Sequence, residues 1–417
     1  MFEKLRKDIN QTFTNKKLDD IFNKCFLNTI DTTLKIDNGD YLIITGDIPA
    51  MWLRDSAMQV FHYLHYIEDK DIQQLIKGTI RKQFSLINID PYANAFMHDE
   101  SCVSEWDGKV QTDYLPKIVW ERKFELDSLC YPFFLCCKYY ELTNDLSIFD
   151  NLFISTFDKA ISTIKTEKNH SKSSSYYFIR GEKENIGRNT NPDEEKGLVW
   201  SGFRPSDDAC QYHYHIPDNM FLVSVLYKLA KVFKAINDSQ REQLCEELVN
   251  ELKELINKYG VVNVKGFGQL YVSETNCLGD YNLNDDANVP SLLSLPFLEY
   301  PFLDEKIYLN TRKYILSNNN KYYYEGKLLK GIGSPHTPAN RVWPLSLSMQ
   351  GITSSDEKEI INCLNQLITS TNNGYLMHES VDCDNPAIYS RPWFAWANSQ
   401  FALFVLKHKD LINKKWC

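Results

Sequence analysis

Carboxylate side chains set among aromatic and arginine residues are the groups in this sequence with the clearest chemistry. Asp207 and Asp208 are adjacent, and Glu379 follows much later in the chain. Mutual repulsion between Asp207 and Asp208 can raise the pKa of one of them and keep it protonated near neutral pH. An inverting glycosidase uses a protonated carboxyl group to protonate the leaving oxygen and a carboxylate on another loop to activate water. The pattern therefore points to cleavage of a glycosidic bond.

Each of these carboxylates also has a structural interpretation. Asp207 or Asp208 could be the N-cap of a helix, because aspartate often accepts hydrogen bonds from the first free N–H groups of a helix. Glu379 taken alone is typical of an exposed or ion-paired glutamate, because glutamate is usually found at the surface. The sequence leaves both alternatives open.

A second charged pair, Arg54 and Asp55, has the same ambiguity. Asp55 or Ser56 could cap a helix over residues 56–67. Alternatively, Arg54 and Asp55 could bind the hydroxyl groups of a sugar whose face packs on Trp52. Aromatic residues make up 13% of the chain, and several stand in such loops beside arginine and carboxylate residues.

Other chemistries find little support in the motifs. His98, His213, His215 and His378 are metal-ligand types, but no helical i, i+4 histidine pair and no Cys/His quartet occurs, so the sequence predicts no metal site and no cofactor. A Gly-rich phosphate loop, a Gly-x-Ser-x-Gly elbow and a dinucleotide fingerprint are also missing. Phosphoryl transfer, serine hydrolysis and dinucleotide redox chemistry are therefore disfavoured.

Apolar residues recur at helical spacing in several segments, which predicts a mostly helical protein. The segments are 126–142, 220–236, 240–259, 354–368 and 393–406. Pro132 would kink the first, Gly260 would be the C-cap of the third, and Pro392 would open the last. Ser354 with Glu357 fits a capping box.

Strand patterns are few, at 41–44 and 322–324, and the polar stretches 169–175 and 181–196 are expected at the surface. No change in composition divides the chain. The prediction is one all-α domain over residues 1–417.

Charge and length restrict the partners. The chain has 417 residues and a formal net charge of −9, which disfavours binding along a nucleic-acid backbone. No secretory signal is visible at the N-terminus, and the apolar run at 401–406 is too short to span a membrane, so a cytoplasmic location without membrane contact is expected. The eleven cysteines lack metal spacing and are expected to be reduced, mostly buried thiols.

Five segments together resemble glycoside hydrolase family 125. They are GDIPAMWLRDSA at 46–57, ELDSLCYP at 125–132, WSGFRPSDDA at 200–209, GIGSPHT at 331–337 and RPWFAWANS at 391–399. The segments span almost the whole chain and are rich in rare residues. The chain departs from the family pattern at Met58, Asp218 and Arg341, outside these segments.

The resemblance implies an (α/α)6 toroid with its active site in the inter-helix loops at one end. It also implies an inverting, metal-independent exo-α-1,6-mannosidase that removes terminal non-reducing mannose from oligosaccharides or N-glycan fragments. The general acid would fall on the Asp-Asp pair, with Asp207 favoured over Asp208, and the general base on Glu379. The substrate-binding residues would be Trp52, Arg54, Asp55, Arg204, Asp208, His336, His378, Arg391 and Asn398.

Other functions remain as alternatives. The same toroid could carry a different glycosidase, or a glycan phosphorylase in which Arg54 or Arg204 supplies an anion pocket. A glycan-binding protein that has lost catalysis is a third possibility. The expected partner in each case is a saccharide, and the sequence does not give the oligomeric state.

Overall fold

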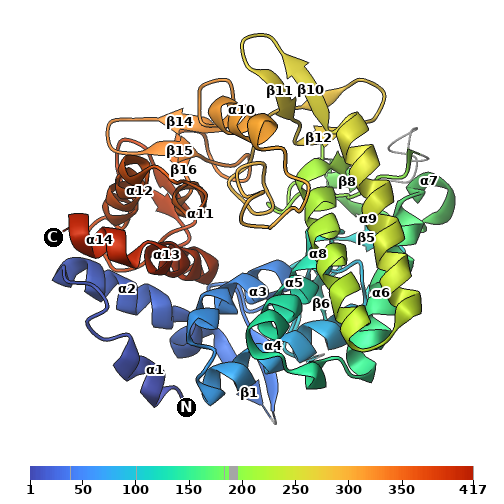
Figure 1. Ribbon diagram of the computed structural model, residues 1–417, viewed down its shortest axis with the longest axis horizontal. Helices are drawn as coiled ribbons and strands as arrows, with labels where there is room; N and C mark the ends of the chain where they lie inside the picture. Colours follow the sequence, from blue (N-terminus) through green and yellow to red (C-terminus); the bar gives the residue numbers. More distant parts are fainter. Residues whose placement is uncertain (38, 100, 183, 187–195, 417) are drawn as a thin grey trace.

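Helices packed side by side form a ring in the computed structural model, which describes residues 1–37, 39–99, 101–182, 184–186 and 196–416 (Figure 1). The helices are α1 (Glu3–Asp8), α2 (Lys16–Asn28), α3 (Leu53–Phe61), α4 (Lys70–Ile89), α5 (Leu126–Thr143), α6 (Asn151–Glu167), α7 (His170–Ser173), α8 (Ile216–Ala235), α9 (Ser239–Tyr259), α10 (Glu305–Ile315), α11 (Pro344–Ile352), α12 (Glu357–Ser370), α13 (Ala395–Lys407) and α14 (Lys409–Lys415). A π-helical turn covers Thr29–Thr33, and 3-10 turns cover His62–Tyr66 and Leu146–Ile148.

Burial separates an inner from an outer set of helices. All nine residues of α3 are buried, whereas α9 buries five of its 21 residues along one stripe. The inner helices α3, α5, α8, α11 and α13 pack in the sequence α11–α13–α3–α5–α8, and α2, α4, α6, α9 and α12 lie outside them. An inner helix is apolar nearly all round because neighbours cover it on every side, while an outer helix keeps one face in water.

The gap between α8 and α11 is filled by turns instead of a helix. Residues 288–299 form this part, which lies between the two helices in Figure 1. Leu292, Leu293, Leu295 and Leu298 are all buried in it. Its side chains thus fill the place where the ring would hold a sixth inner helix.

Eighteen short strands pair antiparallel in the described residues, many more than the sequence indicates. They are β1 (Leu34–Asp37), β2 (Asp40–Ile43), β3 (Met51–Trp52), β4 (Ala95–Phe96), β5 (Gln111–Thr112), β6 (Val119–Glu121), β7 (Phe178–Arg180), β8 (Glu184–Ile186), β9 (Tyr214–His215), β10 (Val261–Val264), β11 (Gly268–Tyr271), β12 (Glu274–Thr275), β13 (Tyr281–Asn282), β14 (Tyr323–Glu325), β15 (Lys330–Ile332), β16 (Arg341–Val342), β17 (Ser380–Asp382) and β18 (Tyr389–Ser390). The three-stranded sheets are β3-β4-β6, β5-β7-β8, β9-β12-β13 and β16-β17-β18. Strands of two or three residues give too short an alternation to be recognised from sequence.

Five of these strands lead directly into inner helices. β3, β6, β9, β16 and β18 precede α3, α5, α8, α11 and α13 by at most four residues. The sheets therefore fix how the chain enters each inner helix, and they gather the N-terminal ends of those helices.

The ring is closed by contacts between early and late segments. Gly46 forms an antiparallel bridge with Phe394, and Asp47 N–H donates to the carbonyl of Trp393 at 3.3 Å. Gly46 has φ of +138°, and a Cβ there would collide with the Trp393 carbonyl, so this approach requires glycine. Near the two termini, the Asn413 side chain accepts from Thr14 N–H at 3.0 Å.

Most helix positions predicted from periodicity are confirmed. α9 ends at Tyr259 with Gly260 as its C-cap, and α5 continues through Pro132. Residues 169–175 include the short helix α7, whose His170 is buried. Most of the segment 181–196 lies outside the described residues.

Two predicted helix starts are wrong. Asp356, which accepts from Lys358 N–H, caps α12, because the Ser354 hydroxyl donates instead to Glu359. The last inner helix begins at Ala395, beyond Pro392, because the chain first makes the β18 pairing.

Nine of the ten described cysteines are buried, as expected, and Cys102 is exposed. None of the helices in the described part of the chain combines the length and apolar character needed to cross a bilayer.

Gly351 tests the packing of α11 on α13. A Cβ added there would overlap the Phe404 ring. Gly351→Ala gains helix propensity, about 1 kcal/mol, but overpacking costs about 1–3 kcal/mol, so a net loss in the free energy of unfolding is expected. Urea unfolding measures it.

The same measurement on Gly351→Ala combined with Phe404→Leu is the control. The smaller side chain should reduce the penalty of the added methyl group, giving a non-zero coupling energy between the two sites. Additive effects would contradict the proposed contact.

Candidate active site

A pocket of about 330 Å³ lies where the N-terminal ends of the inner helices meet. Arg54 and Asp55 reach it from α3, Asp207 from the loop before β9, Glu379 from the start of β17, and Arg391 from the segment before α13. The pocket thus brings together residues that are more than 300 positions apart in the sequence.

Arg54 is the centre of the charged part of this pocket. Its Nη1 donates to Glu125 at 2.6 Å and to Asp127 at 3.3 Å, and its Nη2 donates to Asp207 at 3.1 Å. Its Nε lies 3.5 Å from Asp55. The Arg54 side chain is only 3% exposed, so these four carboxyl groups surround a buried guanidinium.

Asp55 is held in place from the other side by Thr45, whose hydroxyl donates to it at 2.6 Å. Asp55 lies inside the first turn of α3, and Trp52 occupies the N-cap position. The interpretation of Asp55 or Ser56 as a helix cap is therefore wrong, because the helix begins two residues earlier.

Asp207 projects into the pocket from a tight turn. Its φ is +65°, and its N–H donates to the carbonyl of Arg204 at 2.9 Å. Burial acts to raise the pKa of Asp207, but Arg54, a hydrogen bond with Glu125, and Lys123 outweigh burial and lower it. Because α8 starts at Ile216 with His215 at its N-cap, the capping interpretation of the Asp-Asp pair is wrong.

Glu379 lines the same pocket and comes from a distant segment of the chain. The Ser390 hydroxyl donates to its Oε2 at 2.7 Å, and Arg391 Nη1 lies 3.6 Å from its Oε1. Glu379 is 6% exposed, so the interpretation as an exposed glutamate is wrong, whereas the ion-paired alternative agrees with its contact to Arg391. Arg391 is fixed by Asp47, whose Oδ1 accepts from its Nε at 2.9 Å.

Asp208 lies outside the lining of the pocket, next to His336, which is part of it. Its Oδ2 accepts from the Ser206 hydroxyl at 2.9 Å and lies 3.6 Å from His336 Nδ1. Burial acts to lower the pKa of His336, but the Asp208 carboxylate outweighs burial and raises it to about 9. The Asp208 carboxylate therefore favours the charged form of His336.

The expected substrate-binding residues fall into two groups. Trp52, Arg54, Asp55, His336 and Arg391 line the pocket. Asp208, Arg204, His378 and Asn398 lie outside its lining. Asp208 contacts Ser206 and His336, and the contacts of the other three are described below.

Arg204 Nε lies 3.0 Å from Glu274, behind the loop that carries Asp207. His378 stacks on Tyr389 with ring centres 3.7 Å apart and lines a separate pocket. Asn398 is fully buried, and its Oδ1 accepts from Met377 N–H at 2.8 Å. Its contact holds the segment that leads to Glu379.

Several residues that contact the side chains of the pocket were not predicted from the sequence. Glu125 and Asp127 stand within a recognised segment, and the signal for them is a pair of acidic residues at the start of an otherwise apolar helix. Asn94 donates to Glu121, Glu125 and Asp207, and nothing in its local sequence indicates this role.

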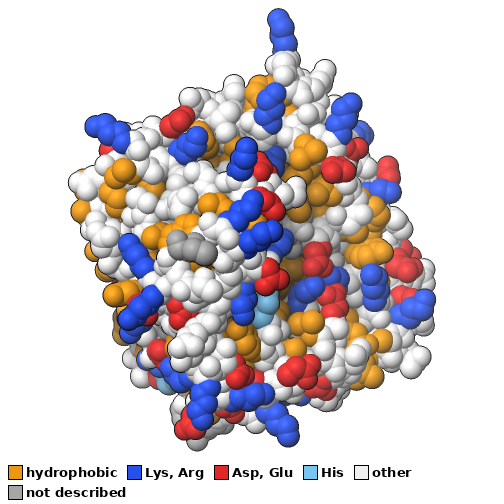
Figure 2. Space-filling model, turned by 60° about the vertical axis from the view of Figure 1, so that its left-hand side comes forward, with side chains coloured by type: hydrophobic (Ala, Val, Ile, Leu, Met, Phe, Trp, Pro, Cys, Tyr) orange, Lys and Arg blue, Asp and Glu red, His pale blue; other side chains and the backbone are white. Residues whose placement is uncertain are grey.

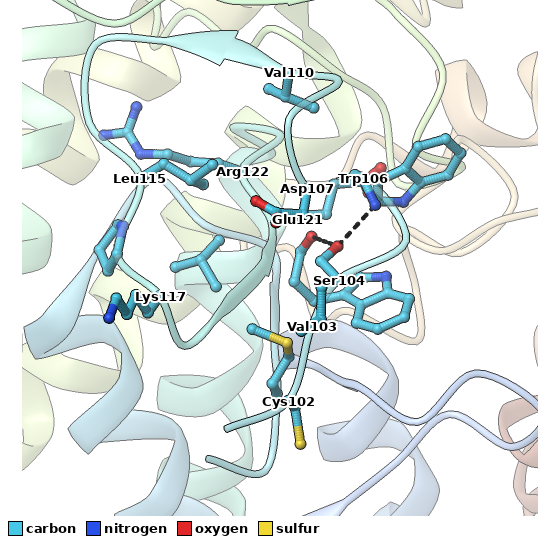
Figure 3. A pocket seen from close by; sticks show the side chains of 14 residues that line it. Cys102, Val103, Ser104, Trp106, Asp107, Val110, Leu115, Lys117, Glu121 and Arg122 are labelled. Atoms are coloured by element: carbon cyan, nitrogen blue, oxygen red, sulfur yellow. Dashed lines mark hydrogen bonds between the residues drawn. The ribbon is translucent and has the colours of Figure 1, made fainter. Parts of the chain in front are cut away.

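A second pocket, of about 320 Å³ (Figure 3), is lined in part by Met97 and Trp120, which belong to the same buried cluster as Trp52 of the first pocket. Its Ser104 hydroxyl donates to the carbonyl of Trp120 at 2.7 Å and accepts from Trp106 N–H at 3.2 Å. These polar groups are satisfied within the protein. Acidic and basic side chains are interspersed over the face drawn in Figure 2, unlike the clustered charge typical of nucleic-acid binding.

Among the described residues, no group of three or more His, Cys, Asp or Glu side chains is arranged to hold a metal ion.

Residues 15–406 match glycoside hydrolase family 125, described as metal-independent alpha-mannosidases. The chain belongs to this family. It is 36% identical to the meiotically up-regulated gene 157 protein of Schizosaccharomyces pombe, over 99% of this chain and 86% of that protein. The family assignment makes the chain a glycoside hydrolase of the α-mannosidase class.

Solved structures agree with the family 125 assignment. A metal-independent α-mannosidase from Streptococcus pneumoniae, in a non-productive complex with α-1,6-mannobiose, superposes with a TM-score of 0.93 and 37% identity, covering 98% of this chain and 97% of that one. A bacterial glucoamylase bound to acarbose has a TM-score of 0.66 and 14% identity over 98% of this chain and 60% of its own. The fold is thus the (α/α)6 toroid expected from the resemblance.

The pairing of His336 with Asp208 gives a direct prediction. In the wild-type family 125 enzyme, the imidazole should titrate near pH 9 in NMR spectra, because the Asp208 carboxylate stabilises the charged ring. Asp208→Asn should bring the pKa of His336 down toward the ordinary value of about 6.5. An unchanged titration in Asp208→Asn would contradict this pairing.

Proposed function

We propose that this enzyme is an inverting exo-α-1,6-mannosidase in which Asp207 is the general acid and Glu379 the general base. The supporting observation is that these two carboxyl groups, from distant segments, line one pocket. The relative from Streptococcus pneumoniae is described in complex with α-1,6-mannobiose, which favours the same disaccharide as a substrate here. We further propose that residues 1–417 form one catalytic domain.

The residues that line the pocket suit a terminal sugar. Asp55 offers an acceptor, and Arg54 and Arg391 offer donors, for the sugar hydroxyl groups. Trp52 and Trp396 supply apolar ring surfaces in the same lining. This set of groups can bind both the hydroxyl groups and the ring face of a terminal mannose.

Two proton transfers complete the proposed reaction. Asp207 gives its proton to the glycosidic oxygen as the C–O bond breaks. Glu379 takes a proton from a water molecule that attacks the opposite face of the sugar, so the configuration inverts. The Ser390 hydroxyl and Arg391 hold the Glu379 carboxylate in its acceptor orientation.

The stereochemistry of the first product tests inversion. Proton NMR of a fresh digest of α-1,6-linked mannobiose should show β-mannose before mutarotation, because the water attacks opposite the leaving group. EDTA should leave the rate unchanged. Release of α-mannose first, or loss of activity with EDTA, would contradict the mechanism, and dependence on added phosphate would indicate a phosphorylase.

Substitutions test the assignment of acid and base. Asp207→Asn and Glu379→Gln should each lower kcat on mannobiose by about 10²–10⁴-fold, since each removes one proton transfer. Asp208→Asn is the matched control and should have a much smaller effect, because Asp208 lies outside the pocket lining and pairs with His336. A larger loss in Asp208→Asn than in Asp207→Asn would transfer the acid role to Asp208.

A further inference from the structure

Glu125 lies directly behind Asp207 and is held by the same donors. Arg54 Nη1 donates to Glu125 at 2.6 Å, while Arg54 Nη2 donates to Asp207 at 3.1 Å. Asn94 Nδ2 lies 3.3 Å from both Glu125 Oε1 and Asp207 Oδ1. The two carboxyl groups share both donors and therefore lie close to each other. A proton on one of two neighbouring carboxyl groups removes the repulsion between their charges.

The charge around Arg54 also favours a bound proton. Four carboxyl groups, those of Asp55, Glu125, Asp127 and Asp207, face one buried guanidinium. Burying an excess of negative charge is costly, and such sites normally respond by binding protons. A proton on one of these groups reduces the excess negative charge.

Glu125 is the member of its pair best suited to keep that proton in the empty pocket. Its side chain has no exposed surface, whereas the Asp207 side chain is 21% exposed and can be solvated as a carboxylate. Burial raises the pKa of Glu125 well above its usual range, and the Asp207 charge adds to this effect. The groups that surround the pair are Arg54 from α3, Asp127 from the same helix as Glu125, Cys210 from the loop before β9, and Lys123 and His336 beside Asp207.

We propose that Glu125 is a positioning residue that stores the catalytic proton and passes it to Asp207 when a sugar fills the pocket. This inference rests on the proposed function, in which Asp207 is the general acid. Sugar binding removes water from Asp207 and brings the glycosidic oxygen to it as a hydrogen-bond acceptor. Both changes favour the protonated form of Asp207, and the Glu125 carboxylate that remains keeps its ion pair with Arg54.

Each proton that moves in the proposed catalytic cycle has a donor and an acceptor. The O–H bond of Glu125 breaks as an O–H bond forms on Asp207, and Asp207 then gives this proton to the glycosidic oxygen as the C–O bond breaks. The attacking water contributes its OH to the sugar and its second proton to Glu379. Glu379 releases that proton to solvent, and the Glu125–Asp207 pair takes one up for the next turnover.

The test compares two substrates in Glu125→Gln. The disaccharide α-1,6-mannobiose needs protonation of its leaving oxygen. The aryl glycoside 2,4-dinitrophenyl α-mannoside releases a stable phenolate without this protonation. Glu125→Gln should lower kcat on mannobiose by about 10²-fold or more with little change in KM, and lower kcat on the aryl mannoside by less than about 5-fold. Equal losses on both substrates, or no loss on mannobiose, would overturn the proposal.

Asp127→Asn is the matched control. Asp127 is as buried as Glu125 and accepts from the same Arg54 nitrogen, so its substitution disturbs the same cluster of carboxyl groups around Arg54. It should affect the two substrates to the same extent. Asp127→Asn could also lower kcat on mannobiose more than on the aryl mannoside, by the same ratio as Glu125→Gln. That result would show a general effect on Arg54 and overturn the proposal.

The pH profile of kcat/KM gives a second readout. In the wild type, loss of the proton shared by Glu125 and Asp207 would leave two neighbouring carboxylates that repel each other. The pair therefore keeps this proton up to a higher pH. In Glu125→Gln, Asp207 faces Arg54 without a second carboxylate, so the alkaline limb on mannobiose should move to lower pH. An alkaline limb in the wild-type position would overturn the proposal.

Infrared spectroscopy tests proton transfer without substitution of Glu125, should that variant fail to fold. Glu379→Gln labelled with ¹³C-aspartate is mixed with mannobiose, and the C=O stretch of the protonated carboxyl group should move to the ¹³C position as the proton reaches Asp207. An unchanged band would overturn the proposal. Failure of the wild type to cleave mannobiose at all would instead refute the proposed function.

Discussion

The buried guanidinium of Arg54 is the interaction on which the pocket depends. It joins carboxyl groups from the first inner helix, the start of the second and the loop before the third. Without a cation there, these groups would repel one another and draw water into the wall of the pocket. The Trp396 ring, 5.7 Å from the guanidinium carbon, covers it from the side of α13. One side chain thus sets the relative positions of elements from most of the ring.

The strands before the inner helices explain why charge gathers at this end. Each short strand delivers its helix with the N-terminal turn facing the pocket, and unpaired N–H groups give that end a positive potential. The first turns of α3, α5 and α8 carry Asp55, Asp127 and Asp218. The backbone of the toroid therefore offsets part of the cost of holding several carboxyl groups together. Because the remaining cost is small, we expect that binding of a sugar can shift protons among these carboxyl groups.

Much of this arrangement could be predicted from the sequence, and the missing part has a definite cause. Helices such as α9 follow from apolar periodicity, since that signal is local. Trp52, Arg54 and Asp55 could be recognised because they stand together in a rare combination. Glu125 and Asn94 could not be assigned, because their roles arise from contacts made across the ring.

Arg204 and Asn398, which are expected to bind substrate, also contact the protein. Arg204 lies beside Glu274, and Asn398 accepts from Met377 N–H, so both support the loops that carry Asp207 and Glu379. A residue type indicates what a side chain can bind, whereas the fold determines which partners lie within its reach.

The bridge between Gly46 and Phe394 has a consequence for the topology of the chain. It joins the segment before the first inner helix to the segment before the last, and Asn413 contacts Thr14 near the termini. The segment that carries Arg391 is therefore joined by hydrogen bonds to the segment that leads to Arg54, although the two are far apart in the sequence. The pocket depends on the cyclic order of the helices and not on where that order begins. A circularly permuted chain, opened in an exposed turn between two outer helices, would contain every neighbour relation that forms this site.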